Sequence, residues 1–565
     1  MKRVVLIAIL GFALSATTTA SGQDLEAGLK SYQKRCSQCH GADGAADGSA
    51  AEYMLPRPRI FKNNPVYKFR TTAGGELPTD EDLFNIITRG IPGTSMPGFD
   101  LLPEEERWNL VAAVKSFNDE ETAFNDEEML ETAVMVEELA IDPASAPAPT
   151  EETIAQGREL FLKAECNKCH GMSGLGNGPS WNSIKDVWED TILPANLSNP
   201  EMFRGGKRAY DIFRTISTGL SGTPMPAHRD DYSVEERWAI VHYVMSLGPV
   251  DKGQRDETIV AVQVDEIPTD AEGWEGMEQF RFMTTSNVVQ PPRNFWATIP
   301  FVNVQAAYSQ DEIALRIQWD DRSQTTGNWC VDGSKEGESC RSDDDCGGST
   351  CGGEPIVDFE YPRATTDILH GTHHPDQFLV QFPVKTSAPS RRPYFMMGDS
   401  KMPVNLWWWR GDTNRIEDKN GKGGRNITTQ SERSQTLDGE VTYEDGRYTM
   451  VVRRTLTTEN ARGDIQFEAG KFLPIAFQAW DGYRGEVGQR RSLTTWYWLY
   501  LRPSPEAAPA GLPGLRIDYV APTAFVLSLL FLLIVFAVIR KGHEAEAAAG
   551  NAETPSESNE PATAS

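Results

Sequence analysis

Positive charge is scarce in this sequence, and the motifs of the large enzyme classes are missing. Among 565 residues there are 54 Lys and Arg against 81 Asp and Glu, which gives a formal net charge of −27. Nucleic acid phosphates are bound by clustered Lys and Arg, so this balance argues against a nucleic-acid partner. No P-loop, dinucleotide fingerprint, metal-hydrolase helix motif or catalytic triad occurs in a supporting context. The sequence therefore argues against nucleotide-dependent and hydrolytic chemistry.

Long apolar runs are restricted to the two ends of the chain. Residues 4–14 follow two basic residues and precede small ones, which predicts that residues 1–22 are a secretory signal peptide. Residues 520–539 are apolar over the length of a membrane-spanning helix and are followed by Arg540 and Lys541. Basic residues there predict a cytoplasmic C-terminus, with most of the chain on the periplasmic side of the inner membrane. The composition of residues 542–565 predicts a disordered tail.

Cysteine is also rare, and half of the eight cysteines lie in two copies of the pattern Cys-x-x-Cys-His. The copies are Cys36, Cys39 and His40, and Cys166, Cys169 and His170. This pattern is typical of c-type haem attachment, in which both thiols bond to the porphyrin and the His is the proximal iron ligand. Zinc and redox sites also use Cys-x-x-Cys and are the alternatives. The repetition favours two covalent haem c groups.

A Gly- and Pro-rich loop that contains a methionine follows each pattern at nearly the same distance. Met96 lies 56 residues after His40 (from 40 to 96), and Met225 lies 55 residues after His170 (from 170 to 225). A single methionine is usually core filler, but the matched spacing predicts that both are distal iron ligands. His228 and His242 could compete as ligands in the second copy. Iron held by two protein ligands would have no open position for a substrate, which favours electron relay over catalysis.

The surrounding helical pattern also occurs twice, at residues 23–118 and 151–249, on either side of an acidic and Pro/Ala-rich linker at 119–150. This arrangement resembles the class I cytochrome c family. The resemblance implies two all-α domains. It also implies thioether bonds at the four motif cysteines, proximal ligands at the two motif histidines, and distal ligands at Met96 and Met225.

After residue 249 the pattern changes to short alternating runs separated by Gly, Asp and Asn, which predicts an antiparallel β-sandwich over residues 250–505. The remaining cysteines lie in a Gly-, Ser- and Asp-rich insert at 325–353. They are Cys330, Cys340, Cys346 and Cys351. An oxidising compartment would join them in two disulfides, with three possible connectivities, and a zinc site is the weaker alternative.

Three stretches of this region, at residues 313–321, 397–407 and 476–482, resemble the haem-binding domain of the gamma subunit of ethylbenzene dehydrogenase. The resemblance implies one non-covalent haem b held by a methionine and a lysine. The methionine corresponds to Met397, with Met396 as the near alternative.

The segment expected to supply the lysine reads Gln-Arg-Arg-Ser at residues 489–492, and a guanidinium has no lone pair for iron. The haem b would therefore take another ligand, be five-coordinate or be absent. Candidate ligands are His370, His373, His374, Lys385 and Lys401.

The predicted fold class is thus two all-α cytochrome c domains, an all-β antiparallel sandwich and one transmembrane helix. The leading hypothesis is an electron-transfer subunit without catalytic activity of its own. The resemblance implies that it connects a molybdenum and iron–sulfur oxidoreductase with the respiratory chain, through a cytochrome c or an oxidase. The alternatives are a haem enzyme with an open-coordinate haem in the sandwich, and a redox-sensing binding module.

Overall fold

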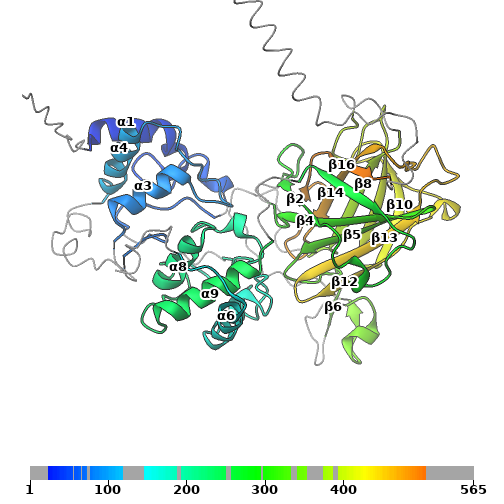
Figure 1. Ribbon diagram of the computed structural model, residues 1–565. Coiled ribbons are helices and arrows are strands. Elements are labelled where there is room, and N and C mark those ends of the chain that lie inside the picture. Colours follow the sequence, from blue (N-terminus) through cyan, green and yellow to red (C-terminus); the bar gives the residue numbers. More distant parts are fainter. Residues whose placement is uncertain are drawn as a thin grey trace, which may run out of the picture. The chain divides into compact units, whose positions relative to one another are not determined.

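The computed structural model describes residues 23–54, 56–64, 67–72, 77–118, 146–186, 192–249, 256–293, 297–331, 340–352, 373–385 and 392–503. The described residues up to Arg502 belong to one compact unit (Figure 1). The predicted signal peptide, most of the linker, the apolar run at 520–539, the tail and His370 lie outside the described residues.

The first helical domain is built from short helices around a small apolar core. Its helices are α1 (Leu25–Arg35), α2 (Ser37–His40), η1 (Ala51–Tyr53), α3 (Asp80–Arg89) and α4 (Glu104–Lys115). Thr79 and Asp82 form a capping box that starts α3, which satisfies two backbone N–H groups of the first turn. The helix ends at Gly90, whose φ of +68° suits glycine. The loop with Met96 begins at this point.

The second helical domain repeats this order. Its helices are α6 (Glu151–Lys163), α7 (Asn167–His170), η5 (Pro200–Met202), α8 (Ala209–Thr218) and α9 (Val234–Ser246). The helix α8 also ends at a glycine, Gly219, with a φ of +64°. In each domain the first and last helices cross so closely that a glycine of the first helix lies against the main chain of the last. A Cβ at Gly28 would lie 2.0 Å from the carbonyl oxygen of Asn109, and a Cβ at Gly157 would lie 1.9 Å from that of Ala239.

We expect the substitution Gly157→Ala to destabilise the second helical domain by about 1–3 kcal/mol, the usual cost of overpacking. The added methyl group would overlap the main chain of α9, which cannot move aside as a flexible side chain can. Thermal unfolding of the full chain, followed by circular dichroism, measures the effect. Gly352→Ala is the control, because a Cβ there meets no atom within 4 Å. Equal melting temperatures for the two variants would contradict the close crossing.

The C-terminal domain is a 14-stranded sheet with a large apolar core (Figure 1). Its strands are β1 (Thr258–Gln263), β2 (Phe280–Met283), β3 (Thr285–Ser286), β4 (Phe301–Tyr308), β5 (Glu312–Asp320), β8 (Gln377–Pro383), β9 (Val404–Arg410), β10 (Arg415–Gly421), β11 (Ile427–Thr429), β12 (Asp438–Glu444), β13 (Arg447–Thr455), β14 (Phe472–Trp480), β15 (Ser492–Leu493) and β16 (Tyr497–Leu501). The main path runs β11-β10-β9-β8-β14-β16-β1-β4-β5-β13-β12. The short helices α10 (Ala271–Trp274) and η7 (Glu432–Ser434) lie in its connections.

Aromatic rings from strands far apart on this path meet in the core. The Trp319 ring of β5 lies 4.2 Å from Phe378 of β8 and 4.9 Å from Tyr448 of β13, measured between ring centroids. The ring of Trp409 on β9 lies 5.9 Å from Trp319. Because β8 and β9 occupy one half of the path and β5 and β13 the other, these contacts hold the two halves face to face.

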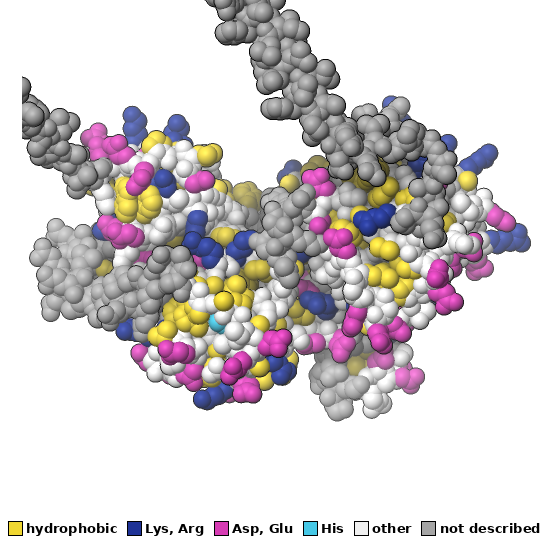
Figure 2. Space-filling model, viewed as in Figure 1, with side chains coloured by type: hydrophobic (Ala, Val, Ile, Leu, Met, Phe, Trp, Pro, Cys, Tyr) yellow, Lys and Arg dark blue, Asp and Glu magenta, His cyan; other side chains and the backbone are white. Residues whose placement is uncertain are grey.

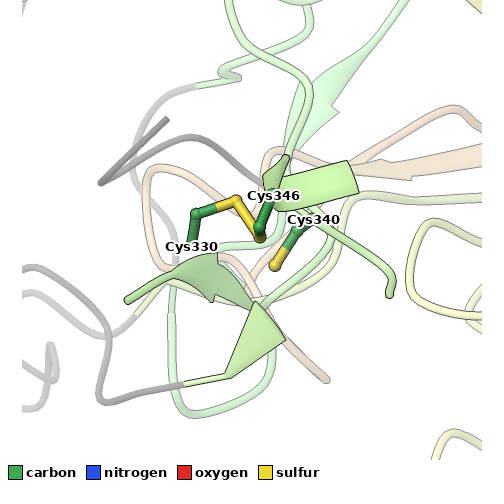
Figure 3. Close-up of side chains that lie close together, drawn as sticks. All are labelled: Cys330, Cys340 and Cys346. Atoms are coloured by element: carbon green, nitrogen blue, oxygen red, sulfur yellow. A yellow bond between two sulfur atoms is a disulfide. The ribbon is translucent and has the colours of Figure 1, made fainter. Parts of the chain in front are cut away.

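The cysteine-containing insert at 325–353 forms a small separate unit. A two-stranded ribbon of β6 (Trp329–Cys330) and β7 (Cys351–Gly352) carries η6 (Asp343–Cys346) between its strands. Cys330 is bonded to Cys346 (Figure 3). Cys340 is bonded to Cys351. These two disulfides select one of the three connectivities that the sequence left open. They also occupy the sulfur atoms that a zinc site would need.

The predicted fold class is wrong in two respects. Strand β1 pairs in parallel with both β16 and β4, so the sheet is mixed and not purely antiparallel. A strand that enters from the preceding domain has no hairpin to fix its direction, and the alternation of residue types does not reveal it. The membrane-spanning helix is not upheld either, because no helix among the described residues is long and apolar enough to cross a bilayer.

Candidate functional site

Each Cys-x-x-Cys-His motif forms one short helix that ends in a sharp turn. In both copies the glycine after the histidine, Gly41 or Gly171, has a φ of +81°. A Cβ at these positions would lie 2.2 Å from Asp47 Oδ1 or 2.0 Å from Asn177 Oδ1, so only glycine fits. The four motif cysteines are not in disulfides. Both thiols and the imidazole of each copy therefore lie on one helical turn.

The imidazole of each motif is held by a main-chain oxygen. Nδ1 of His40 lies 2.9 Å from the carbonyl oxygen of Arg59, and Nδ1 of His170 lies 2.9 Å from that of Ala195. A carbonyl oxygen can only accept, so Nδ1 must be the protonated nitrogen and Nε2 keeps its lone pair. The two copies thus present the same tautomer, which is the one that a metal ligand requires.

The two methionine loops also share their local structure. Thr94 Oγ1 donates to the carbonyl oxygen of Ile91 at 2.8 Å and accepts from the N–H of Met96 at 3.2 Å. In the second copy Thr223 Oγ1 makes the same two contacts, with Leu220 at 2.7 Å and Met225 at 3.3 Å. The threonine hydroxyl therefore fixes the loop directly before the methionine.

In the second domain these parts surround one cavity of about 330 Å³. Cys166, His170 and Met225, from three separate segments, all line it. Apolar residues form most of the remaining wall, among them Phe161, Leu197, Ile212, Ile216 and Val244. The donor set and the apolar wall fit a haem c. In the first domain Cys36 packs in an apolar cluster with Tyr32 and Phe61, of which Met96 is not a member.

Burial keeps these groups in their neutral forms. It raises the pKa of the Cys36 and Cys166 thiols to about 11 and lowers the pKa of His40 and His170. Zinc ligation and redox exchange both need a thiolate, which a lowered thiol pKa would favour. The raised pKa of these thiols thus gives no sign of the reactive thiolate that a redox site uses.

The histidines that could compete as ligands are committed elsewhere. Both ring nitrogens of His242 have partners, Thr153 Oγ1 at 2.8 Å and the carbonyl oxygen of Pro147 at 3.0 Å. His228 is buried, lies 3.6 Å from Asp231 and packs edge-on against Tyr232. Both histidines therefore have packing roles.

The carbonyl oxygens that hold the two histidines, and one arginine beside them, were not predicted from the sequence. A signal for the acceptors exists, because a proline precedes each of them (Pro58 and Pro194) in the segment after the motif. No such signal exists for Arg322, which follows β5 and donates to the carbonyl oxygens of Gly176 and Pro194, both at 3.1 Å. It lines the cavity that contains His170.

In the β-domain, Met397 is 1% exposed and packs in an apolar cluster with Leu379, Val404, Trp480 and Trp496. Its φ of +64° is unusual for a residue other than glycine, and its N–H donates to Gln381 Oε1 at 2.9 Å. A buried thioether held in this way fits one axial ligand of a haem.

A second axial ligand is not found in this cluster. Arg491, in the segment expected to supply lysine, has its guanidinium 5.4 Å from the Trp480 ring centroid. Its pKa is lowered to about 10 by burial, but it offers iron no lone pair. Lys385 and Lys401 are exposed, and His373 and His374 precede β8 at the end away from Gln381. The described residues therefore do not fit the Met/Lys pair that the resemblance implied.

Three family models match the chain. They are Cytochrome C oxidase, cbb3-type, subunit III at residues 23–112, Cytochrome c at 154–248 and Ethylbenzene dehydrogenase at 271–433. A chain of the reducing HAO-like protein complex of Kuenenia stuttgartiensis is 40% identical, over 40% of this chain and 96% of that one, with a TM-score of 0.36.

Two curated relatives also match. A putative respiratory nitrate reductase heme subunit of Haloferax mediterranei is 36% identical over 139 residues, which are 24% of this chain and 48% of that protein. The dimethylsulfide dehydrogenase subunit gamma of Rhodovulum sulfidophilum is 31% identical over 146 residues, which are 25% of this chain and 52% of that protein. The chain thus spans about half the length of these relatives. The family models thus show two cytochrome c domains ahead of a domain similar to ethylbenzene dehydrogenase.

Proposed function

We propose that the protein is the electron-transfer subunit of a respiratory oxidoreductase and carries two haem c groups. Cys36, Cys39, Cys166 and Cys169 would form the thioether bonds, His40 and His170 would be proximal ligands, and Met96 and Met225 distal ones. The observation that carries the proposal is the apolar cavity with Cys166, His170 and Met225 in its wall. The shared contacts of the first copy extend it to a second site.

The protein's part in this function is to orient ligands and exclude water. The carbonyl oxygens of Arg59 and Ala195 hold Nδ1–H of each histidine and leave Nε2 directed to a metal. The threonine of each loop holds the main chain at the methionine. A bound haem c supplies one-electron exchange at its iron. If His and Met both bound that iron, no position would be left for a substrate, and the site would serve relay.

The nature of the partners follows from the relatives. Their names assign them to a nitrate reductase and a dimethylsulfide dehydrogenase. We propose that this chain relays electrons between a molybdenum and iron–sulfur oxidoreductase and the respiratory chain, through a cytochrome c or an oxidase. Its two disulfides support a location on the periplasmic side of the inner membrane. We route no electron through a haem b, since Met397 has no partner ligand in its cluster.

The proposal is tested by counting haem in the exported full chain. We expect pyridine haemochrome analysis and intact mass to give two covalent haem c per chain. The double variants Cys36→Ala/Cys39→Ala and Cys166→Ala/Cys169→Ala should each lose one of the two. The double variant Cys330→Ala/Cys346→Ala is the matched control and should keep both, because its cysteines form a disulfide in the insert.

A chain with no covalent porphyrin would overturn the proposal. Spectra of the reduced, folded protein test the alternative that it is a haem enzyme. We expect no spectral change when carbon monoxide is added to the reduced protein, because both irons have two protein ligands. A clear shift in the wild type would favour a haem enzyme with an open position.

A further inference from the structure

Three aspartates from different strand ends meet in the β-domain, and one of them, Asp321, also lines the cavity that contains His170. Asp321 follows β5, Asp376 precedes β8 and Asp481 follows β14. One carboxylate oxygen of each lies within 4.8 Å of the others. Ca²⁺ holds oxygen ligands at about 2.3–2.6 Å, so oxygens on opposite sides of one ion are about 4.6–5.2 Å apart. The spacing of the three carboxylates is therefore that of ligands around a single ion.

All three aspartates are nearly inaccessible to water, with exposed fractions of 4%, 0% and 6% for Asp321, Asp376 and Asp481. Each carboxylate raises the cost of ionising the others, and burial raises the pKa of all three. Arg322 and Arg484 offset part of this charge, but the Arg322 guanidinium is directed to two carbonyl oxygens of the second helical domain. Buried anions of this kind need a cation or protons at close range.

The hydrogen bonds around the cluster are unevenly distributed. Asp376 accepts from the N–H groups of Thr325 and Gly482 and from the Tyr448 hydroxyl, at 2.6–2.7 Å. Asp481 Oδ1 accepts from the N–H of Arg484 at 3.1 Å. Asp321 Oδ1 accepts from the N–H of Ser323 at 3.2 Å, whereas Asp321 Oδ2 is buried and has no partner. A buried carboxylate oxygen without a donor is unfavourable, and a cation bound at this point would relieve that cost.

Two further oxygens near the cluster are also buried without a hydrogen-bond partner, the hydroxyls of Ser323 and Thr325. Thr325 is fully buried, and its N–H contacts Asp376. The unpartnered atoms of this segment are thus all oxygens, and no sulfur or imidazole belongs to the group of three ligands. An all-oxygen set with several carboxylates suits Ca²⁺, whereas Zn²⁺ sites in proteins usually include nitrogen or sulfur.

We propose that Asp321, Asp376 and Asp481 bind one Ca²⁺, with the hydroxyls of Ser323 and Thr325 as additional oxygen ligands. The ion joins the ends of β5, β8 and β14, which belong to the two halves of the sheet. It also fixes the segment that contacts the second helical domain. Asp320 in this segment accepts from Asn196 Nδ2 at 2.8 Å and from Ser198 Oγ at 2.9 Å, next to the Ala195 carbonyl that holds His170.

The test uses the exported, haem-loaded full chain. We expect elemental analysis to find one Ca²⁺ per chain after gel filtration, and thermal unfolding to show a lower melting temperature in EGTA that CaCl₂ restores and MgCl₂ does not. Calorimetric titration of the EGTA-treated protein with CaCl₂ should show binding that is roughly 10–100-fold weaker for Asp321→Asn. This variant keeps an acceptor for the N–H of Ser323 and removes one negative charge.

Asp311→Asn is the matched control. Asp311 is exposed and does not belong to the cluster, so this variant should bind Ca²⁺ as the wild type does. If the wild type retains no Ca²⁺ and its melting temperature is the same in EGTA and in millimolar CaCl₂, the carboxyls share protons instead and the proposal is overturned. Equal affinity of Asp321→Asn and the wild type would overturn it as well. Neither result depends on the haem count.

Discussion

Replacing Met225 with alanine is expected to open the second haem to carbon monoxide. It should also lower the reduction potential of that haem by on the order of 0.1 V or more, within the span of about 0.8 V that axial ligands set. Methionine raises the potential because its neutral thioether favours the reduced iron. Alanine would remove that ligand and leave the Thr223 contacts to the main chain in place. Reduced-minus-oxidised spectra with carbon monoxide and a redox titration measure both effects.

The matched control is Met202→Ala. Met202 also lines the cavity, but its terminal methyl group lies against Gly93 of the first helical domain. We expect this variant to keep the wild-type potential and to remain unreactive to carbon monoxide. If the reactivity followed Met202→Ala instead, the distal assignment of Met225 would be wrong. The substitution Met96→Ala should open the other haem independently.

Replacing Trp319 with alanine is expected to destabilise the β-domain by about 3–5 kcal/mol, the usual cost of removing a buried tryptophan. Trp319 is 1% exposed, and its ring is in contact with aromatic rings from both halves of the sheet. The cavity would not be filled by one neighbour, because Phe378 and Tyr448 belong to separate strands. Urea unfolding of the full chain, followed by far-ultraviolet circular dichroism, measures the shift of the β-domain transition.

Two further variants separate packing from the loss of an indole. Trp319→Phe should recover much of the stability, since it keeps a stacked ring beside Phe378. Trp498→Ala should cost less than Trp319→Ala, because Trp498 is only partly buried, on β16. A loss of unfolding free energy below about 1 kcal/mol for Trp319→Ala would be in the ordinary range for surface positions and mild changes. Such a result would show that this ring does not join the two halves of the sheet.

The candidate site was largely predictable because its chemistry is local in sequence. The Cys-x-x-Cys-His turn fits on one short helix, and the spacing to Met96 and Met225 repeats in two copies of one domain. The structure adds that the second set lines a single cavity. The capping box at Thr79 is local too.

What could not be predicted depends on contacts between distant segments. The carbonyl groups that hold the two histidines are marked in the sequence only by the proline before each of them, since any residue has a carbonyl group. The parallel pairing of β1 joins it to strands on both sides of the sheet, and the alternation of residue types is the same for either direction. The aspartate cluster contains one residue from each of three strand ends. Its first and last members, Asp321 and Asp481, are more than 100 positions apart in the sequence.

The oxygens that hold the two proximal histidines are main-chain atoms, which no substitution at positions 59 or 195 can delete. Each copy is therefore free to vary the side chain there, and the two have diverged. The first has its own cation, Arg59, whose charge acts on His40. The second has Ala195, and the cation that acts on His170 is Arg322, from a different domain. The positive charge beside the first histidine thus comes from its own domain, whereas that beside the second comes from the β-domain.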